Sequence, residues 1–357
     1  MERFVVIMAG GTGTRLWPIS RKSMPKQFVN IGDGSCMLVQ TIQRMKDTVP
    51  ADHCFIITDK SLKKITYTTV KGLIPTENII LEPERKNTAA CIEYAAITLK
   101  KKYGEGIVCF VPADGYINDR KSYSEAIELA YEAAEETQAL VVVGITPTYP
   151  ATGYGYIQVD KEKGDDERLL IVQKFIEKPD METARKFFES GEFLWNGGIL
   201  VGSLDAIVES IKKFLPEHDQ RIGTAAMRTK GFRSNRYINE AYNKVQNVSF
   251  DNGVLEKTDC IYVIKGLFDW DDIGSIDALS KTFKADDDGN VIKGKYVGVD
   301  TTNSIIISDE TLVTTIGVDN LIIVSTKDSI IVCPRERAQD VKGLVELLKQ
   351  TGHEDIL

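Results

Sequence analysis

The feature that most constrains this chain is an apolar run followed directly by a glycine-rich loop. Phe4–Met8 is apolar and rich in β-branched residues, which is typical of a buried strand, and Gly10, Gly11 and Gly13 come directly after it. Glycines at the end of a strand let backbone amides approach a phosphate closely. We therefore expect a polyphosphate to bind where the first strand ends.

Basic residues follow the glycines at Arg15, Arg21, Lys22 and Lys26, and no Asp or Glu occurs between Arg3 and Gly32. The whole chain is acidic, with a formal net charge of -8. A basic cluster on an acidic chain indicates one local anion pocket. The overall charge argues against duplex nucleic acid or an anionic membrane as the partner.

Apolar runs alternate with segments of helical spacing through the first half of the chain. The expected strands are Phe4–Met8, Cys54–Thr58, Asn78–Leu81, Ile107–Val111 and Leu140–Ile145. The expected helices are Cys36–Asp47, Thr88–Lys102 and Ser122–Thr137. This order predicts an α/β fold with a mostly parallel, Rossmann-like sheet, which binds ligands at the carboxyl ends of its strands.

The pattern changes after Ala285, where an acidic turn, 286–289, begins. Short apolar strands then follow roughly every eight to ten residues, centred on Tyr296, Ile306, Val313, Ile323 and Ile331. We expect residues 1–285 to form a catalytic domain and 286–357 a small all-β domain, a sandwich or a β-solenoid, closed by a helix over Glu336–Lys349. Because its core is thin, this domain should pack on the main domain or on another subunit, and we expect a homodimer formed through it.

The six cysteines lack CxxC spacing, and the chain has only three histidines. We therefore expect free thiols in a reducing compartment and no zinc site. The chain has no apolar stretch of signal-peptide length before its glycines, so we expect a cytoplasmic protein.

Two carboxylates are candidate ligands of Mg²⁺. Asp114, in FVPADGY, follows an expected strand and faces the same sheet edge as the glycine loop. Asp272, in FDWDDIGS, is the second candidate, although it could instead cap a helix that begins near Ser275.

Three further segments have the composition of substrate contacts. They are TGYGYI at Thr152–Ile157, FIEKP at Phe175–Pro179 and LEPERKNTA at Leu81–Ala89. In the first segment, glycines beside aromatic residues suit the close approach of a sugar. In the second, a carboxylate beside an ammonium can bind hydroxyls and a phosphate. In the third, backbone amides at the start of a helix near Asn87 can bind a ligand. A turn with core tyrosines, a surface ion pair and a plain helix cap are the simpler alternatives.

These blocks, in the order MAGGTGTRLWPISRKSMPKQF, LEPERKNTA, VPADGYI, TGYGYI, FIEKP, LWNGGIL, FDNGVLEK and WDDIGS, carry a resemblance. The chain resembles the mannose-1-phosphate guanylyltransferases (GDP-mannose pyrophosphorylases) over nearly its whole length. Its C-terminal NSIIIS, GVDNLIIVSTKDSIIV and AQDVK resemble the β-helical tail of that family. The resemblance implies that GTP and mannose 1-phosphate react to GDP-mannose and pyrophosphate, with Mg²⁺ as cofactor and no covalent enzyme intermediate.

The resemblance also implies the site residues. The catalytic residues are Arg15, Lys26, Asp114 and Asp272, of which Asp114 and Asp272 are the metal ligands. The nucleotide-binding residues are Gly10, Gly11, Gly13, Thr14, Arg15, Lys26, Asn87 and Asp114. The residues for the sugar phosphate are Gly155, Glu177, Lys178, Asn196 and Glu256, with Lys178 on the phosphate.

The chain departs from the family pattern at Gly115, Lys86, Gly197, Asn252, Gly253 and Ile276, where the family usually has His, Arg, Ser, two bulkier residues and Trp. Two interpretations of these departures are open: they have no effect on function, or the smaller side chains leave a looser pocket for the sugar. An isomerase domain follows in longer relatives, whereas this chain ends at Leu357, so we expect no isomerase activity.

Three other functions remain as alternatives. The first is a nucleotidyltransferase for another sugar 1-phosphate or another NTP. An NAD-dependent oxidoreductase would use GGTGTR as its dinucleotide loop, with Asp33 as the acidic residue. A non-catalytic paralogue would have no use for Asp114 and Asp272 together.

Overall fold

The chain folds into two units in this computed structural model, which describes residues 1–11, 13–31, 34–160, 168–228 and 236–357. The sheet unit consists of Met1–Gly10, Thr41–Ala113 and Ile117–Trp270. The β-helix unit consists of Gly11–Gln40, Asp114–Tyr116 and Asp271–Leu357. The glycine-rich loop after Gly10 therefore belongs to the same unit as the C-terminal residues.

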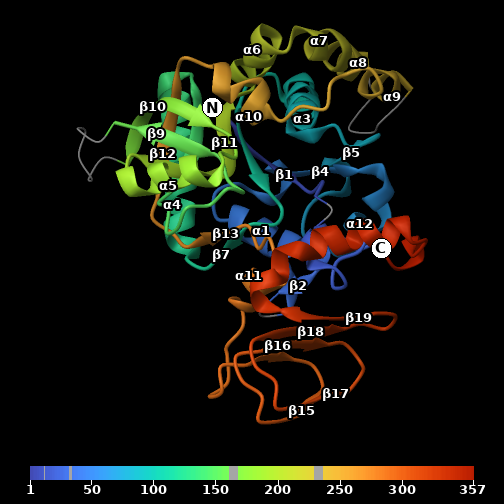
Figure 1. The fold of residues 1–357 in the computed structure, drawn as a ribbon. Coiled ribbons are helices and arrows are strands. Elements are labelled where there is room, and N and C mark those ends of the chain that lie inside the picture. The colour runs from blue at the N-terminus through green and yellow to red at the C-terminus, as the bar shows by residue number, and fades with distance from the viewer. Residues whose placement is uncertain (12, 32–33, 161–167, 229–235) are drawn as a thin grey trace. The chain divides into compact units, whose positions relative to one another are not determined.

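A nine-stranded sheet forms the centre of the sheet unit, in the order β5-β4-β1-β6-β11-β8-β12-β10-β9 (Figure 1). Its strands are β1 (Arg3–Met8), β4 (Cys54–Asp59), β5 (Ile79–Glu82), β6 (Ile107–Pro112), β8 (Leu140–Ile145), β9 (Tyr156–Val159), β10 (Leu169–Ile176), β11 (Phe193–Ser203) and β12 (Ile261–Gly266). The four strands β5, β4, β1 and β6 are parallel, as are β8 and β12. Strand β11 runs antiparallel to both β6 and β8, and β10 runs antiparallel to β12 and β9.

Helices of the sheet unit connect and cover these strands. They are α2 (Lys63–Thr69), α3 (Asn87–Tyr103), α4 (Arg120–Thr137), α5 (Met181–Ser190), α6 (Leu204–Phe214), α7 (Pro216–His218), α8 (Thr224–Arg228), α9 (Arg236–Tyr242) and α10 (Phe250–Gly253). The chain passes between the two units within α1 (Met37–Met45), β7 (Tyr116–Ile117) and β13 (Trp270–Asp271), among other points. No helix among the described residues is both long enough and apolar enough to cross a membrane.

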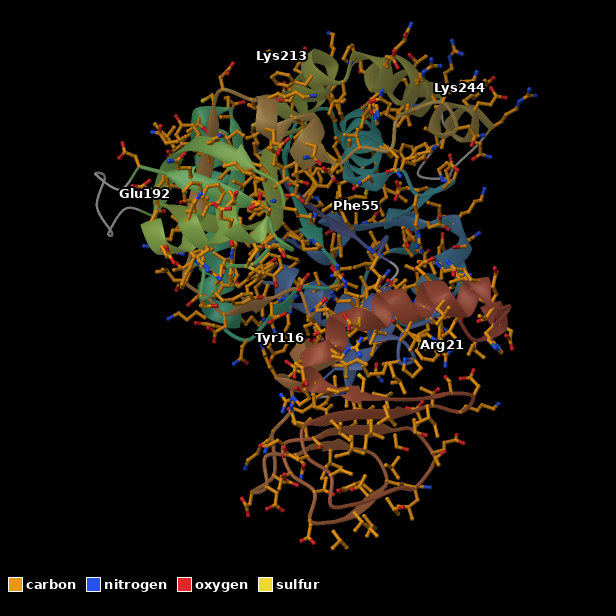
Figure 2. All side chains as sticks on the ribbon, viewed as in Figure 1. Arg21, Phe55, Tyr116, Glu192, Lys213 and Lys244 are labelled. Atoms are coloured by element: carbon orange, nitrogen blue, oxygen red, sulfur yellow. The ribbon has the colours of Figure 1, made fainter. Side chains whose placement is uncertain are left out.

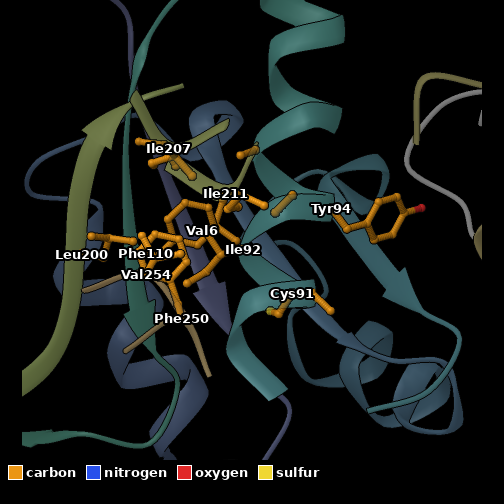
Figure 3. Packing of buried hydrophobic residues seen from close by; sticks show 14 of the residues in the cluster. Val6, Cys91, Ile92, Tyr94, Phe110, Leu200, Ile207, Ile211, Phe250 and Val254 are labelled. Atoms are coloured by element: carbon orange, nitrogen blue, oxygen red, sulfur yellow. The ribbon is translucent and has the colours of Figure 1, made fainter. Parts of the chain in front are cut away.

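Both faces of the central strand β6 are buried. Val108 and Phe110 belong to a core shared with α3 and α6, where Figure 3 shows Phe110 beside Val6 and Ile92. The intervening Cys109 lies on the face covered by α4, whose buried Tyr131 hydroxyl donates to the Phe4 carbonyl, 2.8 Å away. A strand covered by helices on both sides reads as a continuous apolar run, which is why this strand was predictable from the sequence.

A buried carboxyl group at the end of β5 predicts a specific pH dependence of stability. Burial raises the pKa of Glu82 to about 8, and its Oε1 accepts from the Tyr242 hydroxyl at 3.1 Å. An unfolded Glu titrates near about 4.3, so the folded state holds an extra proton between these values. The contribution of Glu82 to stability is therefore fully present below the lower value and is lost as the pH rises towards 8.

We expect Glu82→Gln to remove this loss, so that the variant gains stability relative to the wild type between pH 5 and 8. The gain is at most about 1.4 kcal/mol per pH unit. Urea unfolding at pH 5, 6.5 and 8 measures it. Glu93, whose pKa burial raises to about 7, is present in both proteins and cancels in the difference. Parallel pH profiles for the two proteins would contradict the prediction.

The β-helix unit is a coil of short parallel strands that alternate between two small sheets. Its strands are β14 (Val291–Lys293), β15 (Tyr296–Val299), β16 (Ile305–Ser308), β17 (Val313–Ile316), β18 (Leu321–Ser325) and β19 (Ile330–Pro334). Strands β14, β16 and β18 are parallel neighbours, β15 pairs in parallel with β17, and β19 closes the larger sheet antiparallel to β18. The unit also contains the short strands β2 (Asn30–Ile31) and β3 (Ser35–Cys36), α11 (Ile276–Ser280) and α12 (Val341–Gln350).

The coil packs on the segment that follows the first glycines. Ile305, Ile322 and Val324 of the coil share a buried cluster with Leu16 and Trp17. Helix α12 adds Val341 and Val345 to this cluster, and the Trp17 indole donates to the Ile356 carbonyl at 2.9 Å. The thin core expected for the C-terminal residues is thus completed by N-terminal residues of the same unit.

The structure confirms the expected fold class and adds detail to it. The five expected strands and three expected helices of the first half are present, with ends that differ by no more than two residues. The sheet is mixed, because β11, β10 and β9 add antiparallel pairings to the expected parallel ones. The closing helix begins at Val341, after a 3₁₀ segment at Arg335–Asp340. All six cysteines are free, as expected.

Candidate functional site

A polar cavity in the β-helix unit gathers most of the residues expected around the phosphates. It is lined by Gly13, Thr14, Arg15, Leu16, Lys26, Asp114, Asp272, Ile273, Gly274 and Lys342. All of these residues belong to one unit, although they come from four separate parts of the sequence. Gly10 and Asn87 belong to the sheet unit.

Gly13 is required by the backbone of this cavity. Its φ is +61°, in the left-handed region, and a Cβ at this position would lie 2.4 Å from the Cβ of Lys26. No other residue type fits without moving the Lys26 backbone. The Gly13 carbonyl accepts from the Leu16 amide at 3.0 Å, which starts the 3₁₀ turn Thr14–Leu16 that carries Arg15. The loop therefore presents Arg15 and Lys26 together.

The ammonium of Lys26 joins the two candidate metal-binding segments. Lys26 is only 6% exposed, its Nζ lies 3.0 Å from Asp114 Oδ2, and it also donates to the Asp272 carbonyl. A Cβ on Gly11 would lie 3.7 Å from the same Asp114 oxygen. The carboxylate of Asp114 thus faces both the glycine loop and a buried cation.

Asp272 is not a helix cap. The N-terminus of α11 is capped by Ser275, whose side chain accepts from the Ala278 amide at 3.2 Å. The neighbouring Asp271 accepts from the Ile273 amide at 2.7 Å, and burial raises the pKa of its carboxyl group. The capping alternative for Asp272 at α11 is therefore excluded, and Asp272 is one of the residues that line the cavity.

The donor set of the cavity fits a Mg²⁺ ion bound together with a nucleotide. Mg²⁺ keeps several waters and takes one or two carboxylates plus phosphate oxygens, and Asp114 and Asp272 supply two carboxylates. Across the described residues there is no cluster of three or more His, Cys, Asp or Glu that could hold a metal by itself. The cavity is thus suited to a metal that arrives with phosphates.

Two of the basic residues that follow the glycines lie outside the cavity lining. Arg21, labelled in Figure 2, donates to Ser329 Oγ at 2.7 Å and to Thr326 Oγ1 at 3.1 Å, and it pairs with Asp328 at 2.5 Å. It thereby fastens the N-terminal loop to the turn between β18 and β19. Lys22 is exposed. The basic residues that follow the glycines therefore have different roles. Arg15 and Lys26 line the cavity, whereas Arg21 bonds to the turn between β18 and β19.

The five residues expected at the sugar phosphate lie together in the sheet unit. The Gly155 carbonyl accepts from the Asn196 amide at 2.8 Å, and a Cβ on Gly155 would lie 2.5 Å from Glu177 Oε2. Lys178 forms an ion pair with Glu177, and Glu256 Oε1 accepts from the Glu177 amide at 3.1 Å. Gly155 is therefore a position where only a missing side chain leaves room for the carboxylate.

Asp251 is a member of this cluster that the sequence did not reveal. Its Oδ1 accepts from Asn196 Nδ2 at 2.9 Å, while Asn196 Oδ1 accepts from the Gly198 amide at 3.1 Å. These two contacts fix which end of the Asn196 amide donates. Burial, together with the nearby Glu177 carboxylate, raises the pKa of Asp251 to about 6. In the sequence, only its position as the acidic residue before Asn252 in FDNGVLEK could have pointed to Asp251.

The simpler alternatives describe part of each quoted segment. Tyr156 of TGYGYI is a core residue whose hydroxyl bonds to the Ala151 backbone at 2.9 Å. At the start of α3, the Thr88 amide donates to Asn87 Oδ1 at 2.9 Å, and the Ala89 amide donates to the Val248 carbonyl at 3.3 Å. Both of these amides therefore bond within the protein. Asp33 lies outside the described residues.

Comparisons with known proteins show the family of this chain. The nucleotidyl transferase family model matches residues 4–289, and the model of the MannoseP isomerase/GMP-like beta-helix domain matches residues 294–348. A mannose-1-phosphate guanylyltransferase from Klebsiella pneumoniae and one from Escherichia coli are each 38% identical over 359 residues. Each alignment covers 97% of this chain and 74% of the relative. The chain belongs to the mannose-1-phosphate guanylyltransferase family.

A solved structure shares the fold of this family member over nearly its whole length. It is described as a mannose-1-phosphate geranyltransferase from Thermus thermophilus and is 30% identical, with a TM-score of 0.87. The match covers 98% of this chain and 100% of the other. Nucleotidyl transferases commonly use a divalent metal, which agrees with the donors found in the cavity.

The departures from the usual family pattern do not open space beside the residues expected at the sugar phosphate. A Cβ on Gly197 would lie 3.1 Å from the Val143 carbonyl, and one on Gly253 would lie 2.8 Å from Leu215 Cδ1. Ile276 is fully buried in the core of the β-helix unit. Asn252 donates to Glu256 Oε2 at 3.1 Å and thereby holds that carboxylate. The space that the smaller residues leave is filled by neighbouring atoms, so the structure does not support a looser sugar pocket.

Proposed function

We propose that this chain transfers GMP from GTP to α-D-mannose 1-phosphate and releases GDP-mannose and pyrophosphate. The family assignment supports this activity. The observation that carries it is the cavity in which the glycine loop, Arg15 and Lys26 meet two carboxylates. Such a cavity suits a triphosphate bound with a metal.

In the proposed reaction an oxygen of the sugar phosphate attacks the α-phosphorus of GTP. A new P–O bond forms as the bond to the bridging oxygen breaks, and pyrophosphate leaves with the electron pair. This chemistry needs positioning and charge neutralisation rather than a covalent enzyme intermediate. Arg15 and Lys26 supply positive charge, and the backbone of Gly10, Gly11 and Gly13, with Thr14, holds the triphosphate.

Asp114 and Asp272 are the proposed ligands of Mg²⁺, which when bound neutralises charge on the reacting phosphates. On the sugar side, Glu177 and Asn196 are proposed to bind mannose hydroxyls beside Gly155, and Lys178 its phosphate. Glu256 is also proposed to contact the mannose, and its bonds to the Glu177 amide and to Asn252 support a position beside Glu177. The side-chain amide of Asn87 is proposed to face the nucleoside.

The substrates are tested by incubating the protein and Mg²⁺ with a panel of NTPs and a panel of sugar 1-phosphates, and measuring pyrophosphate release. Release that requires both GTP and mannose 1-phosphate supports the proposal. Faster release with another pair supports the alternative, a nucleotidyltransferase for another sugar 1-phosphate or another NTP. Absence of release with every pair contradicts both.

The domain boundary at 285/286 and a cytoplasmic location remain proposals. The six free cysteines are consistent with a reducing compartment. The two matched family models leave residues 290–293 between them, close to the proposed boundary.

We further propose a homodimer formed through the β-helix unit. The apolar run Leu321–Val324 is covered within the unit itself and does not require a partner. The sheet of β15 and β17 instead exposes Val297, Val299 and Ile316, of which Ile316 is 79% exposed. Exposed apolar side chains grouped on one small sheet favour a second copy as their cover.

We expect light scattering at micromolar concentration to give twice the chain mass of 39.7 kDa. Replacing Val299 and Ile316 with Asp should give a monomer, because the charges would be buried in the interface. Lys327→Asp, at an exposed position in the turn between β18 and β19, is the control and should stay dimeric. A wild-type protein that is monomeric under these conditions would contradict the proposal.

A further inference from the structure

A lysine of the C-terminal helix lines the phosphate cavity. Lys342 lies in the first turn of α12 and lines the cavity together with Gly13, Arg15 and Lys26. The side chain is exposed, and its ammonium has no ion-pair or hydrogen-bond partner among the described residues. This differs from Lys349 at the other end of the helix, which pairs with Glu346.

The helix that carries Lys342 is held firmly against the glycine loop. Val341, directly before Lys342, is 2% exposed, and it packs in the cluster that contains Leu16 and Trp17. Leu16 directly follows Arg15 and also lines the cavity. The Trp17 indole is bonded to the Ile356 carbonyl beyond the end of α12, at 2.9 Å. The position of Lys342 relative to Arg15 is therefore set by a buried core within one unit.

The charge of the cavity depends on this lysine. Among the residues that line it, Arg15, Lys26 and Lys342 are cations, and Asp114 and Asp272 are anions. Lys26 is already paired with Asp114, 3.0 Å away. Without Lys342 the lining is formally neutral, and such a lining would not attract a polyanion before a metal arrives.

We infer that Lys342 is a phosphate-binding residue, through which the C-terminal helix α12 takes a direct part in binding the nucleotide triphosphate. This inference rests on the proposed nucleotidyl transfer. It assigns the C-terminal residues a role in catalysis in addition to any role in assembly. A chain truncated after Asp288, in the acidic turn, would therefore lack Lys342 and with it one residue of the phosphate site.

The test compares Lys342→Ala with the wild type, with Lys349→Ala as the control on the same helix. Pyrophosphate release gives KM for both substrates, and calorimetry with GTP and Mg²⁺ gives binding without the sugar. We expect Lys342→Ala to raise KM and Kd for GTP about tenfold, the size of one charge-assisted contact to phosphate. KM for mannose 1-phosphate should change less than about twofold, and Lys342→Arg should restore most of the affinity.

Ionic strength provides a readout that a structural role would not change. KM for GTP should rise with salt less steeply in Lys342→Ala than in the wild type, because one cation of the cavity is missing. Because Lys342 is exposed, all variants should melt at the wild-type temperature. An unchanged Kd for GTP in Lys342→Ala, or an equal effect of Lys349→Ala, would overturn the inference. A wild type that neither binds GTP nor releases pyrophosphate would instead contradict the proposed function.

Discussion

Asp114→Asn and Asp272→Asn are each expected to reduce pyrophosphate release by at least about a thousandfold. A metal held by these carboxylates, as proposed, would stabilise the developing charge by several kcal/mol, and each factor of ten in rate is about 1.4 kcal/mol. Asparagine keeps the shape of the side chain but removes the charge that binds the cation. The loss should therefore appear in kcat at saturating GTP and mannose 1-phosphate.

The controls separate a metal role from a structural one. Asp287→Asn changes an exposed carboxylate in the acidic turn of the same unit and should leave turnover unchanged. Lys26 keeps its bond to the Asp272 carbonyl in Asp114→Asn, so the melting temperature should fall by only a few degrees. Calorimetry should show that Mg²⁺ no longer strengthens GTP binding in either variant. Turnover near that of the wild type at high Mg²⁺ would contradict the metal role of that residue.

The strands of the first half could be predicted because they are buried on both faces. Strand β1 and strand β6 are apolar at nearly every position, so the run itself marks the strand. Strand β10 is different, because its exposed and buried residues do not alternate regularly and its register shifts between Val172 and Lys174. Such a strand has no clear periodic signal, and its antiparallel place in the sheet could not be read from the sequence.

The candidate site was predictable where chemistry is concentrated in short motifs. Gly13, Arg15 and Lys26 lie within fourteen positions of each other, and the structure places them around one cavity. Lys342 lies more than 300 positions further along the chain, on an otherwise ordinary helix. Only the packing of α12 on Leu16 and Trp17 brings it to the cavity, so nothing local in the sequence marks it.

Charge alone also gave an incomplete interpretation of the basic cluster. Arg21 has the same neighbours in sequence as the cavity residues, yet its guanidinium bonds to Thr326, Asp328 and Ser329. The partner that decides its role lies about 300 residues away in the chain. Asp251 was missed for the same reason, because its contact with Asn196 joins two segments 55 residues apart. Functional and structural roles of charged residues are set by contacts distant in sequence.

Lys178→Ala is expected to raise KM for mannose 1-phosphate by about ten- to a hundredfold, and KM for GTP by less than threefold. An ammonium bound to a phosphate contributes roughly 1.5–3 kcal/mol, which corresponds to this range. The side chain of Lys178 is 61% exposed and paired with Glu177, so its ammonium has donors left for a ligand. Its backbone has a φ of +45°, and Ala has the same Cβ as Lys, so the substitution adds no backbone strain.

Lys174→Ala is the matched control, because Lys174 is an exposed lysine four positions earlier, on the strand β10 that leads to Lys178. It should leave both KM values unchanged. The loss in Lys178→Ala should be confined to the sugar phosphate, since Gly155 and Asn196, which are proposed to contact the mannose ring, remain in place. Initial rates over a grid of both substrates measure the two KM values. Equal increases for GTP and for mannose 1-phosphate would place the Lys178 ammonium on the triphosphate and contradict its assignment to the sugar phosphate.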